Sequence, residues 1–110
     1  MKKCLFILLT VILISGCYNQ QTKTSNVERG DNEIIINNFA FNPSELTVNS
    51  GTAVTWKNAH NVVHTVVSQN LFESKTLNKG DEFAFTFNTP GEYNYYCSIH
   101  PSMGGKVIVK

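Results

Sequence analysis

Residues 83–88 read FAFTFN, so a phenylalanine stands at every second position. Side chains at alternate positions of a strand point to the same face, whereas a helix would spread these three rings around its axis. One face of such a strand is aromatic and the other is small or polar, which is the pattern of a strand with one buried face. This segment predicts a β-strand that covers a hydrophobic core.

Short runs of β-branched and aromatic residues continue along the chain from about Asp31. They are separated by turn signals at Asn42-Pro43, Asn49-Ser50-Gly51 and Thr89-Pro90-Gly91, and none of them carries a convincing helical period. The strands that we expect cover residues 33–36, 45–48, 52–56, 83–88, 93–97 and 106–109. This arrangement predicts an all-β fold, an antiparallel sandwich or barrel, in about 80 residues.

The first 16 residues have the composition of an export signal. Two lysines precede an apolar run from Leu5 to Ile14, which is about half of the roughly 20 residues that a bilayer requires. The end of this run, LISGC, resembles the bacterial lipobox, in which the cysteine, here Cys17, is lipidated and becomes the mature N-terminus. Two acyl chains there would give stable anchoring. Ordinary cleavage near Gly16 is the alternative, and both readings predict export.

Residues 18–30, YNQQTKTSNVERG, are polar and are expected to form a flexible tether. The predicted organisation is a signal peptide in residues 1–16, a lipidated N-terminus and tether in 17–30, and a folded domain in 31–110. We therefore expect a membrane-anchored lipoprotein on the extracytoplasmic side, in a periplasm or at a cell surface. Loss of Lys2 and Lys3 leaves seven basic against eight acidic residues, and this near-neutral balance, without a basic patch, gives no sign of nucleic-acid binding.

The cysteines leave one thiol without a partner in the mature domain. Of the three cysteines, Cys4 is lost with the signal and Cys17 is expected to be acylated, so Cys97 stands alone. Oxidising compartments favour paired cysteines, so a lone thiol in an exported domain is unusual. A buried, inert cysteine is the ordinary explanation, and the neighbours of Cys97 decide against it.

The stretch YYCSIHPSMGG places His100 three positions after Cys97 and Met103 three positions further on. Proline and a glycine pair make this a loop rather than a helix, and a short loop can present three side chains to one point. His64, at an expected strand start, is the leading candidate for a fourth ligand. Two imidazoles, a thiolate and a weak thioether are the donor set of a blue-copper electron-transfer centre. Structural zinc prefers four good N or S donors, and non-haem iron prefers a carboxylate.

Residues from about 31 to 110 resemble a cupredoxin of the small plastocyanin and amicyanin type. The matching segments are GTAVTWKN at 51–58, HTV at 64–66, TPGEY at 89–93 and YCSIHPSMGGKV at 96–107. They occur in the order and spacing of the family over nearly the whole domain. The resemblance implies a Greek-key β-sandwich of about eight strands with one type 1 copper ion at one end.

The resemblance also implies roles for individual residues. His64 corresponds to the first imidazole ligand, Cys97 to the thiolate, His100 to the second imidazole and Met103 to the axial ligand. The compact loop from Cys97 to Met103 is similar to that of amicyanin. Residues Thr65 and Ser98 stand where hydrogen bonds would hold the ligands in place and tune the potential.

Two features depart from the pattern of the family. Val63 stands where close relatives usually have proline, and His60 is an extra histidine in a His-Asn-Val-Val segment. Because His60 follows Trp56 by only four positions, we expect His64 to be the ligand and His60 to be a loop residue. The family also places residues near 39–41 at the copper end, so Phe39 or Phe41 is a candidate for an apolar docking face, with ordinary burial as the preferred alternative.

These observations predict a monomeric copper protein that shuttles one electron between exported redox partners, such as a cytochrome, an oxidase or a dehydrogenase. Copper capture or delivery by the same ligands is the alternative function. An enzyme is not expected. Cys97 with His100 as base could be imagined as a nucleophile, but nothing in the sequence resembles an oxyanion hole.

Overall fold

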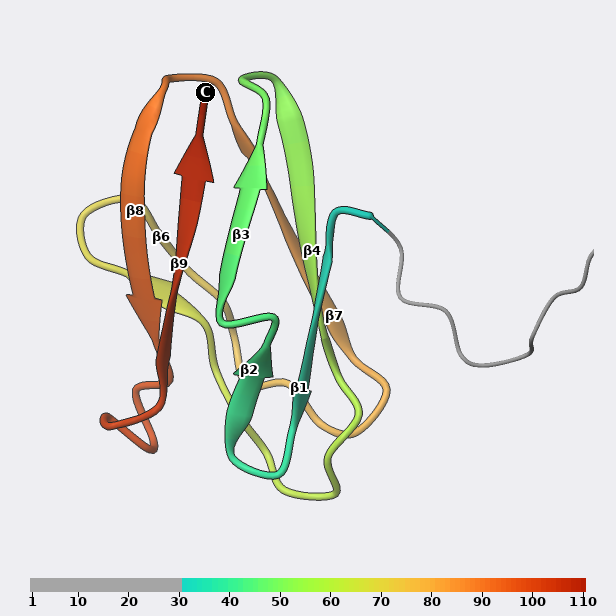
Figure 1. Ribbon diagram of the computed structural model, residues 1–110. Coiled ribbons are helices and arrows are strands. Elements are labelled where there is room, and N and C mark those ends of the chain that lie inside the picture. Colours follow the sequence, from blue (N-terminus) through green and yellow to red (C-terminus); the bar gives the residue numbers. More distant parts are fainter. Residues whose placement is uncertain (1–30) are drawn as a thin grey trace, which may run out of the picture.

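The computed structural model describes residues 31–110 and contains nine strands and no helix in that range (Figure 1). The predicted signal peptide, Cys17 and the tether lie outside the described residues. The strands are β1 (Glu33–Asn37), β2 (Ala40–Asn42), β3 (Glu45–Val48), β4 (Thr52–Asn58), β5 (Val67–Ser68), β6 (Phe72–Glu73), β7 (Glu82–Phe87), β8 (Gly91–Tyr96) and β9 (Gly104–Val109). In this range no helix is long and apolar enough to cross a membrane.

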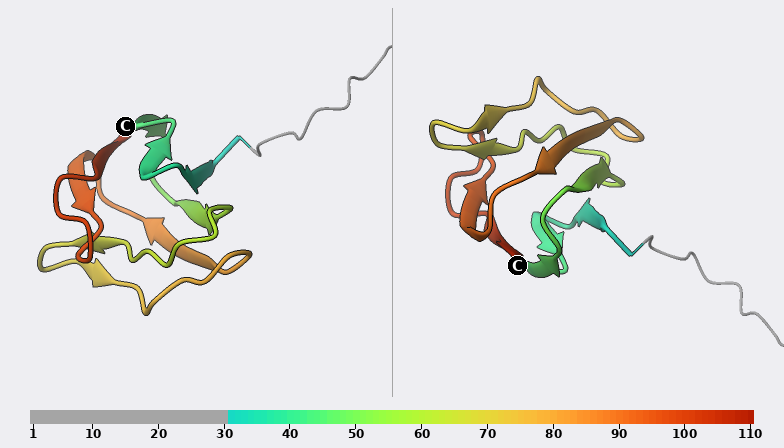
Figure 2. Two further views of the ribbon diagram at one scale, coloured as in Figure 1. Left: turned by 90° about the horizontal axis from the view of Figure 1, so that it is seen from below. Right: turned by 90° about the horizontal axis from the view of Figure 1, so that it is seen from above.

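The strands form two sheets that pack face to face as a sandwich (Figure 2). One sheet has the order β2-β1-β4-β7 and the other β3-β9-β8-β5-β6. The predicted all-β sandwich is confirmed. The strand number is nine rather than about eight, because β2, β5 and β6 are two- or three-residue strands that carry no periodic pattern.

Both sheets are mixed, so the expected purely antiparallel arrangement is wrong for two pairs of strands. β1 runs parallel to β4, and β3 runs parallel to β9. After the β1–β2 hairpin in one sheet, the chain crosses to the other sheet, where β3 pairs with the last strand. It then returns to the first sheet, where β4 pairs with β1. Parallel partners are distant in sequence, so a local pattern does not reveal them.

The core is built on Trp56, which is fully buried and contacts the rings of Phe72, Phe83, Phe87 and Tyr95. The alternation in β7 is confirmed, because its three phenylalanines lie on one face and pack against this core. Full burial of each large apolar side chain contributes about 1.5–3 kcal/mol to folding. The aromatic layer therefore supplies much of the stabilisation that holds the two sheets together.

The Tyr95 ring packs against the backbone of Gly105. Tyr95 is the cross-strand partner of Gly105 in the β8–β9 ladder. A Cβ added to Gly105 would collide with the phenol ring and come within 3.0 Å of the carbonyl oxygen of Ser44. Gly105 is thus required for close packing. The backbone of Gly105 is not in the left-handed region, so the need for glycine there comes from packing alone.

Candidate metal centre

Three connections meet at one end of the sandwich, the lower end in Figure 1. They are the β1–β2 hairpin, the segment between β4 and β5 that carries His64, and the β8–β9 loop that carries Cys97, His100 and Met103. The sheet topology alone brings these connections together, because the strands that flank them end at the same edge of the sandwich. The four residues predicted as ligands come from the last two connections.

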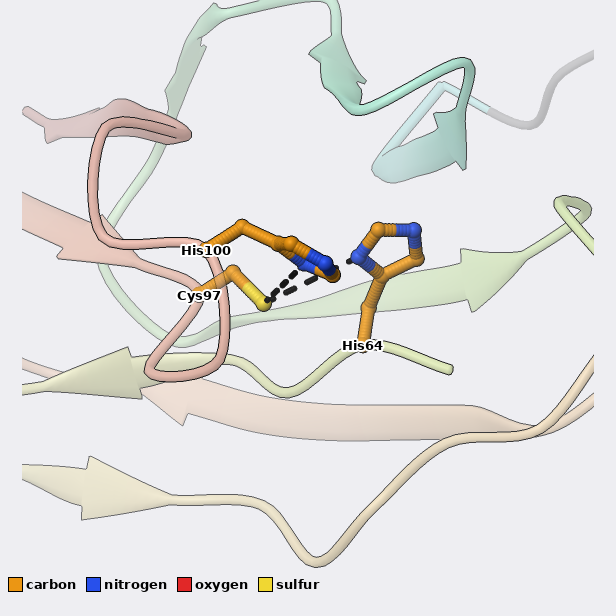
Figure 3. Close-up of side chains that lie close together, drawn as sticks. All are labelled: His64, Cys97 and His100. Atoms are coloured by element: carbon orange, nitrogen blue, oxygen red, sulfur yellow. Dashed lines mark hydrogen bonds between the residues drawn. The ribbon is translucent and has the colours of Figure 1, made fainter. Parts of the chain in front are cut away.

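The sulfur of Cys97 and one nitrogen from each of two imidazoles form a triangle of donor atoms (Figure 3). Its Sγ is 3.7 Å from Nδ1 of His64 and 3.5 Å from Nδ1 of His100. One donor atom from each of the three residues lies within 4.8 Å of the others. Cys97 and His64 are fully buried, whereas His100 is only partly buried. The cluster therefore reaches the surface through His100.

Backbone hydrogen bonds hold the β8–β9 loop in a compact shape. The amide of Cys97 donates to the carbonyl of Met103 at 3.0 Å, the amide of His100 donates to Cys97 at 3.2 Å, and that of Met103 donates to His100 at 2.8 Å. Met103 is buried, with 5% of its surface exposed. These bonds fix the three residues of the loop relative to one another, as the spacing predicts.

Thr65 and Ser98 connect the two ligand-bearing segments. The amide of Thr65 donates towards the sulfur of Cys97 at 3.4 Å, and its hydroxyl oxygen lies 3.8 Å from the same sulfur. The amide of Ser98 donates to Thr65 Oγ1, and the two hydroxyls are 2.8 Å apart. Thr65 therefore contacts the thiol, and Ser98 contacts Thr65.

His64 is held by backbone pairing and lies among other imidazoles. Its amide and carbonyl pair with Leu77 at 3.1 and 2.8 Å. Burial, and then the nearby His100 and His60, hold the pKa of His64 below its usual value of 6.5. The side chain is therefore biased towards the neutral form, which is the form that binds metals.

His60 lies behind His64 and not beside the thiol. Its Nδ1 is 3.0 Å from Nε2 of His64, on the side of that ring that faces away from Cys97. The preference for His64 over His60 as the residue facing the thiol agrees with this geometry. The contact between the two histidines was not expected from the sequence.

Asn58, for which no sequence motif predicted a role, shapes the segment that carries both histidines. This fully buried side chain donates through Nδ2 to the carbonyls of Val62 and Leu77, and its Oδ1 accepts from the amide of His60, each at 2.9 Å. The available signal was an asparagine that ends a strand directly before a histidine-containing loop. A buried amide with three partners is a strong local organiser.

The two candidates for the docking face, Phe39 and Phe41, have different surroundings. Phe41 is buried and packs edge-on against Tyr95, whereas Phe39 is half exposed. The Phe39 ring stands edge-on to His60, His64 and His100, with centroid distances of 4.7, 5.8 and 5.1 Å. Both Asn38 and Phe39 have positive φ, at 53° and 58°. A strained hairpin turn therefore holds an aromatic ring over the histidines.

The donor set fits copper better than the other common metals. A thiolate, two imidazoles and a thioether match the three strong ligands and one weak ligand of a type 1 copper site. Structural zinc would gain little from a thioether. No carboxylate joins the cluster within residues 31–110, so the site also lacks the ligand that non-haem iron prefers.

Comparisons with known proteins point to one family. Residues 5–109 match the cupredoxin-like domain family. The chain is 38% identical to an amicyanin of Paracoccus versutus over 72 residues, covering 60% of this chain and 54% of that protein. It is 34% identical to amicyanin-alpha of Methylorubrum extorquens, covering 74% of this chain and 73% of the relative. The chain thus spans about half the length of the first relative and most of the second.

A solved structure supports the same conclusion. The fold superposes on an amicyanin variant in its reduced Cu(I) form with a TM-score of 0.69 and 32% identity, covering 76% of this chain and 86% of the other. The chain belongs to the cupredoxin family.

Proposed function

We propose that residues 31–110 form a type 1 copper domain that carries one electron between redox proteins outside the cytoplasm. His64, Cys97 and His100 would be the strong ligands and Met103 the weak axial ligand. When bound there, copper would supply a Cu(I)/Cu(II) couple. The observation that carries the proposal is the triangle formed by the Cys97 sulfur and the Nδ1 atoms of His64 and His100.

The surroundings of the cluster favour electron transfer over release of the metal. Fast electron transfer requires ligands that move little when the charge changes, and here backbone hydrogen bonds hold Cys97, Met103 and His64. Full burial of Cys97 and His64 restricts access for a competing ligand. This favours a carrier over the alternative of copper capture and delivery, which requires rapid exchange of the ion. A non-enzymatic role follows from the same closed site.

Electrons would enter and leave through His100, because His64 and Cys97 are fully buried. Exposed apolar side chains lie on the same connections: Phe39 is 50%, Val63 38% and Ile99 45% exposed. An apolar surface of this kind suits a transient redox partner, since it can desolvate the contact without a fixed set of ion pairs. The partner would be a cytochrome, an oxidase or a dehydrogenase.

The N-terminal segments would keep the domain at a membrane. In this proposal residues 1–16 direct export, Cys17 carries the lipid, and residues 18–30 are the tether. The support is the lipobox-like sequence and the length of the apolar run. The domain would act as a monomer on the extracytoplasmic side, in a periplasm or at a cell surface.

A visible spectrum tests the copper assignment. The purified full chain is treated with Cu(II) and then with ascorbate, and the expected result is an intense blue thiolate-to-copper band that bleaches on reduction and returns on oxidation. Cys97→Ser keeps Cys4 and Cys17 and should lose the band, which excludes the other thiols as its source. A pale wild-type complex with tight copper binding would contradict the proposal and favour copper delivery.

A further inference from the structure

The contact between His60 and His64 has two possible arrangements of the proton. For a hydrogen bond to form at 3.0 Å, one of the two facing nitrogens, Nδ1 of His60 or Nε2 of His64, must carry hydrogen. If His60 donates, a neutral His64 has its own proton on Nδ1, which faces the Cys97 sulfur at 3.7 Å. If His64 donates through Nε2, its Nδ1 keeps a free lone pair. Only the second arrangement leaves His64 ready to bind a metal.

We propose that His60 is a positioning residue of the metal centre: its Nδ1 accepts a hydrogen bond from Nε2–H of His64 and keeps the Nδ1 lone pair of His64 directed to the site. The inference rests on the proposed function, since it takes His64 as a ligand. A histidine ligand is generally oriented by a partner on its second nitrogen, such as a carboxylate, a carbonyl or a water. In this chain a second imidazole takes that place.

The local structure is built to hold His60 in this position. The amide of His60 donates to Oδ1 of Asn58, whose Nδ2 group ties down the carbonyls of Val62 and Leu77 around the same segment. The two imidazole planes are within 15° of each other and the ring centroids are 5.2 Å apart, so the facing nitrogens at 3.0 Å lie close to the line between the centroids and nearly in the plane of both rings. This geometry suits a hydrogen bond between ring nitrogens.

Phe39 packs against both histidines of this contact. Its ring stands edge-on to both imidazoles, at 4.7 Å from His60 and 5.8 Å from His64 between ring centroids. The Phe39 ring covers one side of this part-buried contact and limits the freedom of His60 to rotate. A hydrogen bond that is shielded from water orients its partners more strongly than an exposed one.

The proposal predicts two effects of losing the acceptor. His64 should populate both neutral tautomers in the metal-free protein, and Cu(II) affinity should fall about tenfold or more, as for other partners of histidine ligands. The midpoint potential should rise, because a less basic imidazole weakens the binding of Cu(II) more than the binding of Cu(I). His60→Phe keeps a ring of similar size without the acceptor, and His60→Gln offers an amide oxygen in its place.

The experiment uses the purified full chain with ¹⁵N-labelled histidine. Nitrogen chemical shifts of the metal-free protein, at a pH of about 8 where imidazoles are neutral, report which nitrogen of His64 carries the proton. Cu(II) affinity and midpoint potential are then measured by chelator competition and redox titration. Asn61→Ala, an exposed change one position along the same segment, is the matched control.

The expected result is a wild-type His64 protonated on Nε2, a mixed tautomer and weaker Cu(II) binding in His60→Phe, and recovery in His60→Gln. Protonation of His64 on Nδ1 in the wild type would overturn the inference, as would equal affinities in His60→Phe and Asn61→Ala. If His60→Phe does not fold, His60→Ala supplies the same comparison. A wild type without a blue band would defeat the proposed function, while the metal-free tautomer would still decide the role of His60.

Discussion

The backbone amide of Thr65 lies 3.4 Å from the sulfur of Cys97, which is 32 residues away in the sequence. The Thr65 hydroxyl in turn accepts the amide of Ser98, so one residue ties the thiol and the loop after it to the His64 segment. Thr65→Val removes the hydroxyl that accepts the hydrogen bond from the Ser98 amide. The unfolding free energy of the metal-free protein should fall by about 1–3 kcal/mol.

Urea unfolding measures this effect, and Thr47→Val, at an exposed position of β3, is the control for the loss of a hydroxyl. Equal midpoints for the two variants would show that the Ser98 amide finds another partner. Because the Thr65 amide is part of the backbone, its interaction with the sulfur should survive the substitution. The blue band of the copper-loaded variant is therefore expected to remain.

Met103→Leu should raise the midpoint potential and keep the thiolate-to-copper band. A thioether is a weak donor that favours Cu(II), and leucine fills a similar volume without it. The substitution conserves volume in a buried site, so the unfolding free energy of the metal-free protein should change by less than about 1.5 kcal/mol. Redox titration and urea unfolding check the two parts. A potential equal to that of the wild type would remove Met103 from the ligand set.

Tyr95 should make the fold sensitive to alkaline pH. Burial raises the pKa of Tyr95 to about 12, and the neighbouring Trp56 indole opposes this rise only in part. The unfolded chain has an ordinary tyrosine pKa of about 10, so the folded state holds the phenol proton more tightly. The stabilisation is complete below pH 10 and is lost as pH rises to about 12. Two pKa units correspond to roughly 3 kcal/mol.

Unfolding of the wild type and Tyr95→Phe at a series of alkaline pH values isolates this contribution. Between pH 10 and about 12 the wild type should lose stability relative to Tyr95→Phe, which has no phenol to ionise. Tyr96→Phe, which removes an exposed phenol from the next position, is the control. Parallel stability curves for wild type and Tyr95→Phe would contradict the predicted linkage.

Cys17→Ser should release the domain from the membrane. The proposal makes Cys17 the lipid attachment site, so mass spectrometry of the exported wild type should find the acyl modification on that residue. In the variant, the protein should move from the membrane fraction to the soluble exported fraction while the blue band stays. Membrane association that is unchanged by Cys17→Ser would point to another means of attachment.

Local sequence patterns were sufficient for the long strands and for the compact loop from Cys97 to Met103. The alternation in residues 83–87 depends only on neighbours along the chain, and the spacing of Cys97, His100 and Met103 lies within one loop. The predicted roles of Thr65 and Ser98 came from the family, and the hydrogen bonds around Cys97 agree with them. In these cases the relevant partners are near in sequence or fixed by a known fold.

Long-range packing was beyond such patterns. The two parallel strand pairs, the need for glycine at Gly105, and the placement of Phe39 over three imidazoles depend on which segments meet in space. The role of His60 depends on Asn58, whose three hydrogen bonds set the path of a segment with no regular secondary structure. No property of an isolated histidine encodes that environment.

The parallel pairing of β3 with β9 has a consequence for the order of folding. β9 is the last of the described strands in the sequence, and it lies between β3 and β8 in its sheet. The loop from Cys97 to Met103 is closed only when β8 and β9 pair. Until β9 pairs with β8, the side chains of this loop are not held together, so in the proposed function the metal binds after the sheet is complete.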